Sequence, residues 1–375
     1  MSREILKTKW NEIKRIVIKI GSNLIVDPTT NQICTENIQN LVRGILFLKN
    51  NHKDVILVSS GAVAFGKKRL NNAIPKDQIP LDPSLVHKQA FASIGQIELM
   101  NFYRKIFRMN QLEIAQILIT AKDFRDRETY LNVGHTIQEL IKLNIIPIIN
   151  ENDTVSTDEL KFGDNDFLSA AVSALLNCQL LILLTSVDGF LINGERISTL
   201  NKIDKQIFSY AKGPEGYGSG GMYSKIRVGS LCLKAGVDVA ILPGKEENII
   251  EKFFNQEDVG TFIYSKEKKF LKARKRWLLF SRTKGAVYID EGAEIALLKK
   301  GSSLLINGIK EIEGKFTIGD VVEIKNLKNE ILGRGIINLS HKNLKKYLEN
   351  KMQNNKIYNL SEVINRDDLI LEVTD

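Results

Sequence analysis

Residues 15–21 read RIVIKIG, an apolar and largely β-branched run that ends in glycine, and similar runs recur along the first 260 residues. Each run is too continuously apolar for a strand with one face in water, which is typical of a parallel sheet covered on both faces. Helical patterns lie between the runs, such as TENIQNLVRGILFLKN at 35–50. The alternation predicts an α/β fold with a right-handed, doubly wound, largely parallel sheet. The further runs are DVILVSSGA (54–62), NIIPIINEND (144–153), CQLLILLTSVDG (178–189) and VDVAILPG (237–244).

Glycines and polar residues gather directly after these runs. In a sheet of this kind, ligands bind outside the carboxyl ends of the strands, so these segments indicate where a site would lie. Another cluster, GYGSGGMYSK at 216–225, opens a helical pattern. The segments that follow strands are IKIGSN (18–23), VSSGAVAFG (58–66), INENDTVS (149–156) and LLTSVDG (183–189).

A change of character near residue 264 predicts a second domain. Residues 266–276, KEKKFLKARKR, carry seven basic residues and one acid, which is typical of an exposed connector, and short strand patterns with turn signals follow. A chain of 375 residues is also long enough for two domains. We therefore predict an α/β domain over 1–264, a basic linker over 265–274, a small β-rich domain over 275–353, and a C-terminal tail over 354–375 that packs on the domains.

Composition excludes several classes of protein. Hydrophobic residues at 43% and charged residues at 26% exclude a disordered or fibrous chain, and the apolar runs fall short of the roughly 18 residues of a membrane helix. The N-terminal MSREILKTKW lacks the features of a secretory signal. Three widely spaced cysteines (Cys34, Cys178 and Cys232) give neither a disulfide framework nor a metal cluster. We expect a soluble, cytoplasmic protein without a metal site built from its own side chains.

The net charge of +9 does not by itself indicate a nucleic-acid partner. The excess is diffuse lysine in a chain that is also rich in Ile and Asn. A positive field would equally suit anionic substrates such as nucleotides and carboxylates.

The run GSGGMYSK (218–225) is the sharpest local signal. Its glycines allow the backbone to approach a ligand, and the helix that follows would present free N–H groups to a phosphate. Lys225 adds a positive charge of the kind that phosphoryl transfer needs. The spacing is not that of a Walker A motif, and a plain flexible loop before a helix is the alternative.

Lys19 lies inside an apolar strand run, directly before Gly21 and Ser22. Burying an ammonium group is costly, so such a lysine is paired, reaches a site, or extends past the sheet into water. Asn23 reads as an ordinary turn residue.

Acids and amides concentrate between residues 150 and 166, in the sequences NEND and GDND. Such a segment could hold the ammonium group of a substrate or position a cation and lysines; a pair of capped turns is the alternative. Ser60 follows the second strand run and could contact an anionic group or serve as an N-cap. The sequence shows no pairing of a nucleophile with a general base. The four histidines are scattered and do not resemble a zinc site.

The motifs IKIGSN, VSSGAVAFG, KQAFASIGQIELM (88–100), INENDTVS, KFGDNDFLSA (161–170) and GSGGMYSK resemble, in order and spacing, those of the glutamate 5-kinases. This family belongs to the amino-acid kinase superfamily. The segment from RKRWLLF through DEGAEIALLKKGSSLLINGI to GDVVEI resembles the PUA module that many bacterial members carry. The resemblance covers nearly the whole chain and implies an amino-acid kinase fold followed by a PUA-like domain.

The resemblance implies a role for each matching residue. Lys19 and Lys225 match two catalytic lysines, and Asp166 matches the aspartate that orients them. Ser60, Asp153 and Asn165 match residues that hold the amino acid, and Asp164 takes a supporting substrate role. The residues implied at the nucleotide are Lys19, Gly21, Thr185, Ser186, Ser219, Gly220, Gly221, Met222 and Lys225.

One position departs from the family pattern. Family members often have aspartate where this chain has Ser186, which leaves the role of that side chain toward the nucleotide open. Asp188 follows two residues later.

The implied reaction transfers a phosphoryl group from ATP, with Mg²⁺, to the side-chain carboxylate of L-glutamate, as the first step of proline biosynthesis. The resemblance also implies feedback inhibition by proline and a homo-oligomer, either dimer or tetramer. Two alternatives stay open. One is a related carboxylate kinase such as acetylglutamate kinase. The other is an RNA-binding protein that acts through the PUA-like domain. The C-terminal part of the chain lacks an obvious aromatic platform for stacking bases, which argues against RNA binding.

Overall fold

The structure is a computed structural model that describes residues 7, 9–75, 79–80, 82–124, 126–156, 164–212, 221–266, 271–354 and 361–371. Of Asp164, Lys212 and residues 351–354 it describes the backbone alone. The chain divides into two compact units, Met1–Phe270 and Leu271–Asp375. The bounds that the sequence suggests for the linker and the tail stay predictions.

The first unit is built on one large sheet. Every strand pairing in this sheet is parallel except that of β9 with β10, so the doubly wound, largely parallel sheet predicted from the sequence is confirmed. In spatial order the strands are β3 (Ile114–Ile119), β4 (Ile146–Glu151), β2 (Asp54–Val58), β1 (Arg15–Ile20), β5 (Leu180–Thr185), β9 (Asp238–Pro243), β10 (Thr261–Ile263) and β8 (Thr199–Leu200). A separate short hairpin joins β6 (Leu191–Ile192) and β7 (Glu195–Arg196).

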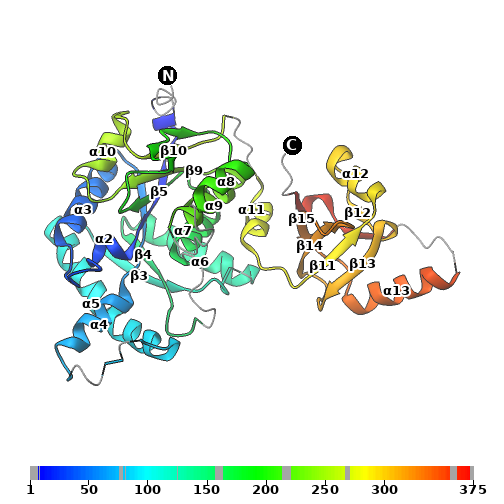
Figure 1. Cartoon of the computed structure of the whole chain (residues 1–375), viewed down its shortest axis with the longest axis horizontal. Helices are drawn as coiled ribbons and strands as arrows, with labels where there is room; N and C mark the ends of the chain where they lie inside the picture. Colours follow the sequence, from blue (N-terminus) through cyan, green and yellow to red (C-terminus); the bar gives the residue numbers. More distant parts are fainter. Residues whose placement is uncertain are drawn as a thin grey trace. The chain divides into compact units, whose positions relative to one another are not determined.

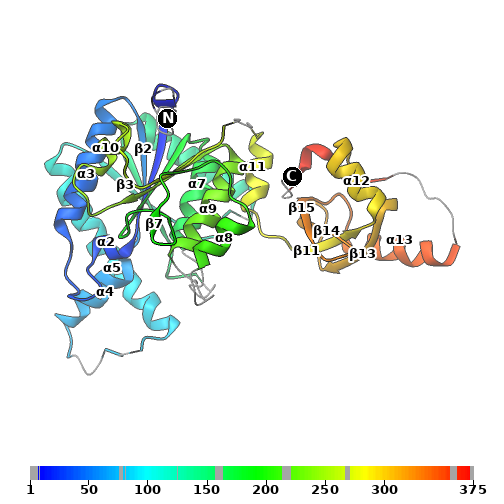
Figure 2. The same cartoon turned by 45° about the horizontal axis from the view of Figure 1, so that its top comes forward.

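Helices cover both faces of this sheet (Figures 1 and 2). One layer contains α3, α5 and α10, whose buried side chains share a single apolar cluster with alternate residues of the strands. The other layer contains α7 and α9. The helices of the unit are α2 (Ser22–Ile25), α3 (Thr35–Asn50), α4 (Ala62–Asn71), α5 (Leu85–Met109), α6 (Arg127–Lys142), α7 (Asp164–Leu175), α8 (Lys205–Lys212), α9 (Met222–Ala235) and α10 (Ile249–Phe254).

Strand alternation decides which layer each side chain meets. Ile18 and Ile20 of β1 belong to the cluster with α3 and α5, so Lys19 between them points to the layer of α7 and α9. By the same alternation Ile148 of β4 faces α5, and Asn150 points the same way at the end of that strand.

The register brings the carboxyl ends of the central strands to one level. Lys19 of β1 pairs with Val58 of β2 and with Leu183 of β5, and Val58 pairs in turn with Ile149 of β4. The segments after these strands therefore meet at one edge of the sheet, as the sequence indicated.

Two glycines allow α4 and α5 to pack with their backbones in contact. A Cβ on Gly66 would lie 1.8 Å from the carbonyl oxygen of Phe91, and a Cβ on Gly95 would lie 1.8 Å from that of Ala62. Neither position accepts a side chain without moving a helix. This close approach fixes α5 behind the carboxyl ends of β2 and β4.

The second unit is a small β-rich domain with its own apolar core, as predicted. A five-stranded sheet has the order β13 (Ile309–Gly314), β11 (Gly285–Ile289), β14 (Val321–Asn326), β15 (Ile331–Ile336) and β17 (Leu369–Leu371). A second sheet pairs β12 (Leu304–Leu305) with β16 (Glu362–Ile364). The helices are α11 (Ala273–Phe280), α12 (Glu291–Lys300) and α13 (His341–Asn354), with 3₁₀ turns at Ile306–Gly308 and Arg366–Asp368.

Across the parts of the chain that the structure describes, the helices are all too short or too polar to cross a membrane.

Candidate active site

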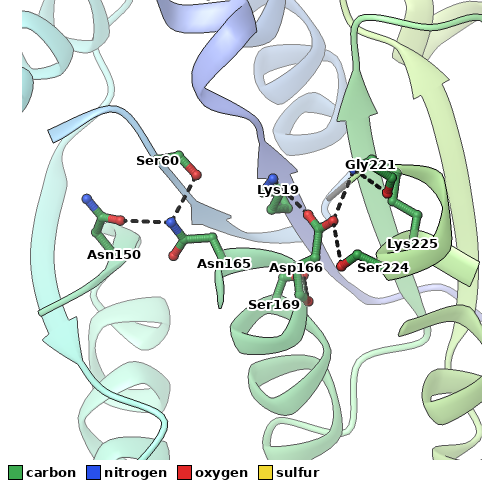
Figure 3. Close-up of polar contacts among 9 residues, drawn as sticks. All are labelled: Lys19, Ser60, Asn150, Asn165, Asp166, Ser169, Gly221, Ser224 and Lys225. Atoms are coloured by element: carbon green, nitrogen blue, oxygen red, sulfur yellow. Dashed lines mark hydrogen bonds and ion pairs between the residues drawn. The ribbon is translucent and has the colours of Figure 1, made fainter. Parts of the chain in front are cut away.

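Two lysines and an aspartate meet at the carboxyl edge of the large sheet. Lys19 comes from the end of β1, Asp166 from the first turn of α7 and Lys225 from the first turn of α9. The Nζ of Lys19 lies 2.7 Å from Oδ1 of Asp166, and the Nζ of Lys225 lies 3.0 Å from Oδ2 (Figure 3). We call these three residues the lysine half of the site.

The lysine half is buried, and its charges shift one another's protonation. Both lysine side chains are 10% exposed, and that of Asp166 is 3% exposed. Burial lowers the pKa of Lys19 below its ordinary value; Asp166 opposes this shift and Lys225 adds to it. Burial alone would raise the pKa of Asp166, but the two ammonium groups outweigh it and hold that pKa below its usual range. With both lysines protonated, two cations against one anion leave a net charge of +1, which attracts an anionic group.

Glycines keep the backbone close to the lysine half. Gly221 precedes α9 with φ at 111°, a conformation that side chains disfavour, and its carbonyl oxygen lies 3.5 Å from the Nζ of Lys225. A Cβ on Gly21 would lie 3.6 Å from the Nζ of Lys19, so a longer side chain there would crowd the tip of that lysine.

Neutral groups form the opposite part of the site. The Nδ2 of Asn165 donates to Oγ of Ser60 at 2.9 Å and to Oδ1 of Asn150 at 3.2 Å (Figure 3). Both amide hydrogens of Asn165 are thereby used. Its Oδ1 is buried and has no hydrogen-bond partner among the described residues. We call Ser60, Asn150 and Asn165 the amide half of the site; it offers an unused acceptor oxygen.

Asp153 adds a carboxylate two residues beyond the end of β4. Burial raises the pKa of Asp153 to about 6. At neutral pH the group is therefore mostly ionised, and it can accept hydrogen bonds from a substrate ammonium group.

A cavity of about 400 Å³ connects the two halves. This volume lies within the range of pockets that bind small ligands. Polar residues make up most of its wall, and no histidine or cysteine occurs among the described residues that line it. The lining residues are Lys19, Gly21, Ser22, Asn23, Leu24, Ser60, Glu151, Asp153, Asn165, Asp166, Leu184, Thr185, Ser186, Gly221 and Lys225.

The structure brings most of the predicted site residues to this one cavity, including Thr185 and Ser186 at the end of β5. Met222 begins α9 beside Gly221 but does not line the cavity. Asp164 begins α7, and the structure describes only its backbone. Ser219 and Gly220 also lie outside the described residues. The individual roles of all these residues stay predictions.

The sequence interpretation assigned no role to several residues that the structure places here. Ser22, Asn23 and Glu151 line the cavity, and Asn23 had been interpreted as an ordinary turn residue. Asn150 had been noted within its polar run without a role. Directly behind the wall, Gln96 of α5 contacts Asn150, and nothing in its helical pattern marks it.

Comparisons with known proteins agree with this architecture. Residues 14–243 match the model of the amino acid kinase family, and residues 285–358 match the model of the PUA domain. A glutamate 5-kinase from Dictyoglomus thermophilum is 40% identical over 96% of this chain and 98% of the relative. The chain belongs to the glutamate 5-kinase family. A second glutamate 5-kinase, from Carboxydothermus hydrogenoformans, is 38% identical over 98% of this chain and 99% of the relative.

Membership of the glutamate 5-kinase family confirms the resemblance that the motifs indicated. A solved carbamate kinase from Giardia lamblia bound to AMP-PNP matches 67% of this chain and 98% of its own, at 16% identity and a TM-score of 0.48. That likeness is too distant to support any statement about this chain.

In a kinase, the two halves of the cavity suit different parts of the reaction. The lysine half can neutralise negative charge on a phosphoryl group without any proton transfer. The amide half and Asp153 supply acceptors that suit an ammonium group. Residues of the lysine half and of the amide half line the same cavity, so one small molecule bound there can contact both halves.

Proposed function

We propose that this protein transfers the γ-phosphoryl group of ATP to the side-chain carboxylate of L-glutamate, which gives L-glutamyl 5-phosphate and ADP. In proline biosynthesis this is the first step. The observation that carries the proposal is the position of Asp166 between Lys19 and Lys225 in the wall of a cavity that Asp153 and Asn165 also line.

The reaction needs positioning and charge neutralisation more than proton transfer. A glutamate side chain with an ordinary pKa of about 4.3 is already ionised at neutral pH, so its oxygen can attack phosphorus without a general base. As the new oxygen–phosphorus bond forms, the bond to the ADP oxygen breaks and ADP leaves with that electron pair. Lys19 and Lys225, held apart by Asp166, stabilise the negative charge spread over the transferred group.

The amide half orients the amino acid. Asp153 and Oδ1 of Asn165 accept hydrogen bonds from the ammonium group. Ser60 accepts a hydrogen bond from Asn165 through its Oγ, so its own hydroxyl hydrogen is available to donate to the α-carboxylate. The side-chain carboxylate is thereby directed toward the lysine half.

Magnesium would reach this site with the nucleotide. Among the described residues, no cluster of three or more carboxylate, histidine or cysteine side chains is arranged to hold a metal, and both oxygens of Asp166 face lysines. The described residues would therefore leave Mg²⁺ to arrive with the nucleotide, beside Lys19 and Lys225. When bound, the ion would supply further positive charge at the phosphates.

The test is ADP release from Mg-ATP with L-glutamate, N-acetylglutamate, aspartate or no acceptor, with hydroxylamine present to trap an acyl phosphate as hydroxamate. We expect turnover and hydroxamate with L-glutamate, and a large fall in both with Lys19→Ala. Turnover with N-acetylglutamate instead would overturn the substrate, and no turnover with any acceptor would overturn the activity.

Three further properties belong to this proposal. Proline is expected to inhibit by competing at the glutamate site, which the same assay tests by adding proline at several glutamate concentrations. The segment between Asp153 and Gly163, where we would look for its effect, lies largely outside the described residues. We also expect a homo-oligomer, testable by light scattering. The sulfur atoms of Cys34, Cys178 and Cys232 are not joined in disulfides, which supports a cytoplasmic location.

A further inference from the structure

Gln96 lies on α5, behind the amide half. Its Oε1 accepts a hydrogen bond from Nδ2 of Asn150 at 2.9 Å. Its Nε2 is buried and has no hydrogen-bond partner among the described residues. The contact with Asn150 therefore accounts for the direction in which this side chain lies.

The carboxamide of Asn150 has a fixed direction. The backbone N–H of Glu151 donates to one of its terminal atoms at 3.0 Å, and because a backbone N–H is a donor, that atom must be the oxygen. The Nδ2 of Asn150 then points to α5 and requires an acceptor, which is Oε1 of Gln96. Asn150 is 2% exposed, so water does not replace that acceptor.

The direction of Asn150 sets the direction of Asn165. The Oδ1 of Asn150 accepts from Nδ2 of Asn165, which also donates to Ser60 (Figure 3). With both hydrogens directed to these oxygens, Oδ1 of Asn165 is the atom of this carboxamide that keeps no partner among the described residues. A rotated carboxamide would instead present N–H groups to the ligand.

We propose that Gln96 is a positioning residue that, through Asn150, holds the carboxamide of Asn165 with its oxygen toward the ammonium group of the amino acid. This role rests on the proposed function, because it concerns how the same site recognises its substrate. The relay from Gln96 to Asn150 to Asn165 favours a substrate with a free, charged amino group.

Replacing Gln96 by methionine keeps the shape of the side chain and removes the acceptor. The Nδ2 of Asn150 is then buried without this acceptor, and the carboxamides of Asn150 and Asn165 lose one of the two contacts that hold their direction, the other being the backbone N–H of Glu151. We expect the KM for glutamate to rise about ten-fold. The KM for ATP and kcat should stay within about two-fold, because the amide half binds the amino acid alike in the ground state and the transition state.

Three further variants make the test specific. Gln96→Glu keeps an acceptor oxygen for Asn150 and should restore the KM for glutamate to within about three-fold of the parent. Gln96→Asn keeps a polar side chain but shortens it by one methylene, which moves the acceptor oxygen away from Asn150. This variant replaces Gln96→Met in the test if the methionine variant does not fold. Gln179→Met is the matched control, since Gln179 accepts hydrogen bonds from the backbone of Lys14 and Arg15 at the amino end of the sheet.

Each outcome decides between this role and simple packing. A raised KM for glutamate in Gln96→Met, absent in Gln179→Met and reversed in Gln96→Glu, supports the relay. Any of three results overturns it. The first is an unchanged KM for glutamate in Gln96→Met, and the second is a fall in kcat together with a raised KM for both glutamate and ATP. The third is a Gln96→Glu variant that is as impaired as Gln96→Met. A parent enzyme that does not turn over glutamate would overturn the proposed function and this role with it, whereas an active parent with insensitive Gln96 variants overturns this role alone.

Discussion

The lysine half and the amide half of the cavity hold their ligands by different physical means. In the lysine half, two buried ammonium groups face one carboxylate, and an excess positive charge remains for an anion. In the amide half the groups are neutral, and directional hydrogen bonds connect Ser60 and Asn165 through Asn150 to Gln96.

This difference separates the kinetic effects expected from each half. A charge acts over several ångströms and is strongest on the group whose charge grows in the transition state. A carboxamide acts only at hydrogen-bond distance. If it is rotated by half a turn, it presents a donor nitrogen where an acceptor oxygen is needed. Changes in the lysine half should therefore lower kcat, and changes in the amide half should raise the KM for the amino acid.

The largest effect is expected from Lys225→Ala. Removing this ammonium group takes away charge stabilisation at the transferred phosphoryl group, so kcat should fall about 10²- to 10³-fold. The KM for glutamate should change by less than about three-fold, because Lys225 contacts Asp166 and not the amide half.

Steady-state kinetics with varied glutamate and varied ATP measure both quantities. Lys234→Ala, at the last turn of the same helix α9, is the matched control for removing a lysine from that helix. A variant of Lys225 that keeps the parent kcat would remove this residue from the reaction and erase the contrast between the halves.

An intermediate effect is expected from acid. Burial raises the pKa of Asp153 to about 6 from its usual 3.8, so the carboxylate that receives the ammonium group becomes protonated below pH 6. We expect kcat/KM for glutamate to fall about ten-fold per pH unit below that value, while kcat changes little. The side chain of the substrate itself titrates near 4.3, too low to produce an inflection at pH 6.

The control is Asp153→Asn, which should bind glutamate weakly at every pH and show no inflection near 6. Stability should move in the opposite direction. Because the folded-state pKa is raised, Asp153 favours the fold while protonated, and this contribution is lost as pH rises from about 4 to about 6. The asparagine variant should therefore melt above the parent at pH 8 and no higher than the parent at pH 4. An inflection that survives in the variant would assign the titration to another group.

The sequence predicts the parts of the fold whose pattern is local. The strands β1, β2, β4, β5 and β9 are continuous apolar runs, since helices cover both their faces. At the edge of the sheet, β3 leaves Gln116 and Leu118 exposed, and this interrupts the pattern by which the other runs were recognised. The strands β8 and β10 are too short to show any periodicity.

The same limit applies to the site. Lys19, Asp166 and Lys225 can be singled out because charged residues beside apolar runs and glycine loops are unusual, and the family motifs point to the same positions. Gln96 lies within the family motif at 88–100, but its residue type and its place in the helical pattern give it no role. It is one amide on a long amphipathic helix, its partner Asn150 lies 54 positions away, and the contact follows from the close packing of α4 on α5 and the alternation of β4.

The smallest effect is expected from Tyr103→Phe. This variant tests whether α5 supports the amide half through the hydrogen bonds that orient its carboxamides or only through the packing of the helix. Tyr103 lies two turns beyond Gln96 on α5, and its OH meets Oγ of Ser59 at 2.8 Å, with Ser59 next to Ser60. Burial raises the pKa of Tyr103, so the phenol stays protonated across the working range.

Phenylalanine at position 103 removes one neutral hydrogen bond and keeps the edge-on contact of the ring with Phe107, whose centroid lies 5.9 Å away. Ser59 still donates to the carbonyl oxygen of Ser60, so no carboxamide loses its direction. We expect the free energy of unfolding to fall by about 1 kcal/mol and the KM for glutamate to rise less than about two-fold, measured by urea unfolding and steady-state kinetics. If Tyr103→Phe raised that KM as much as Gln96→Met, the amide half would depend on the placement of α5 as a whole, and the directional relay through Asn150 would not be needed to explain it.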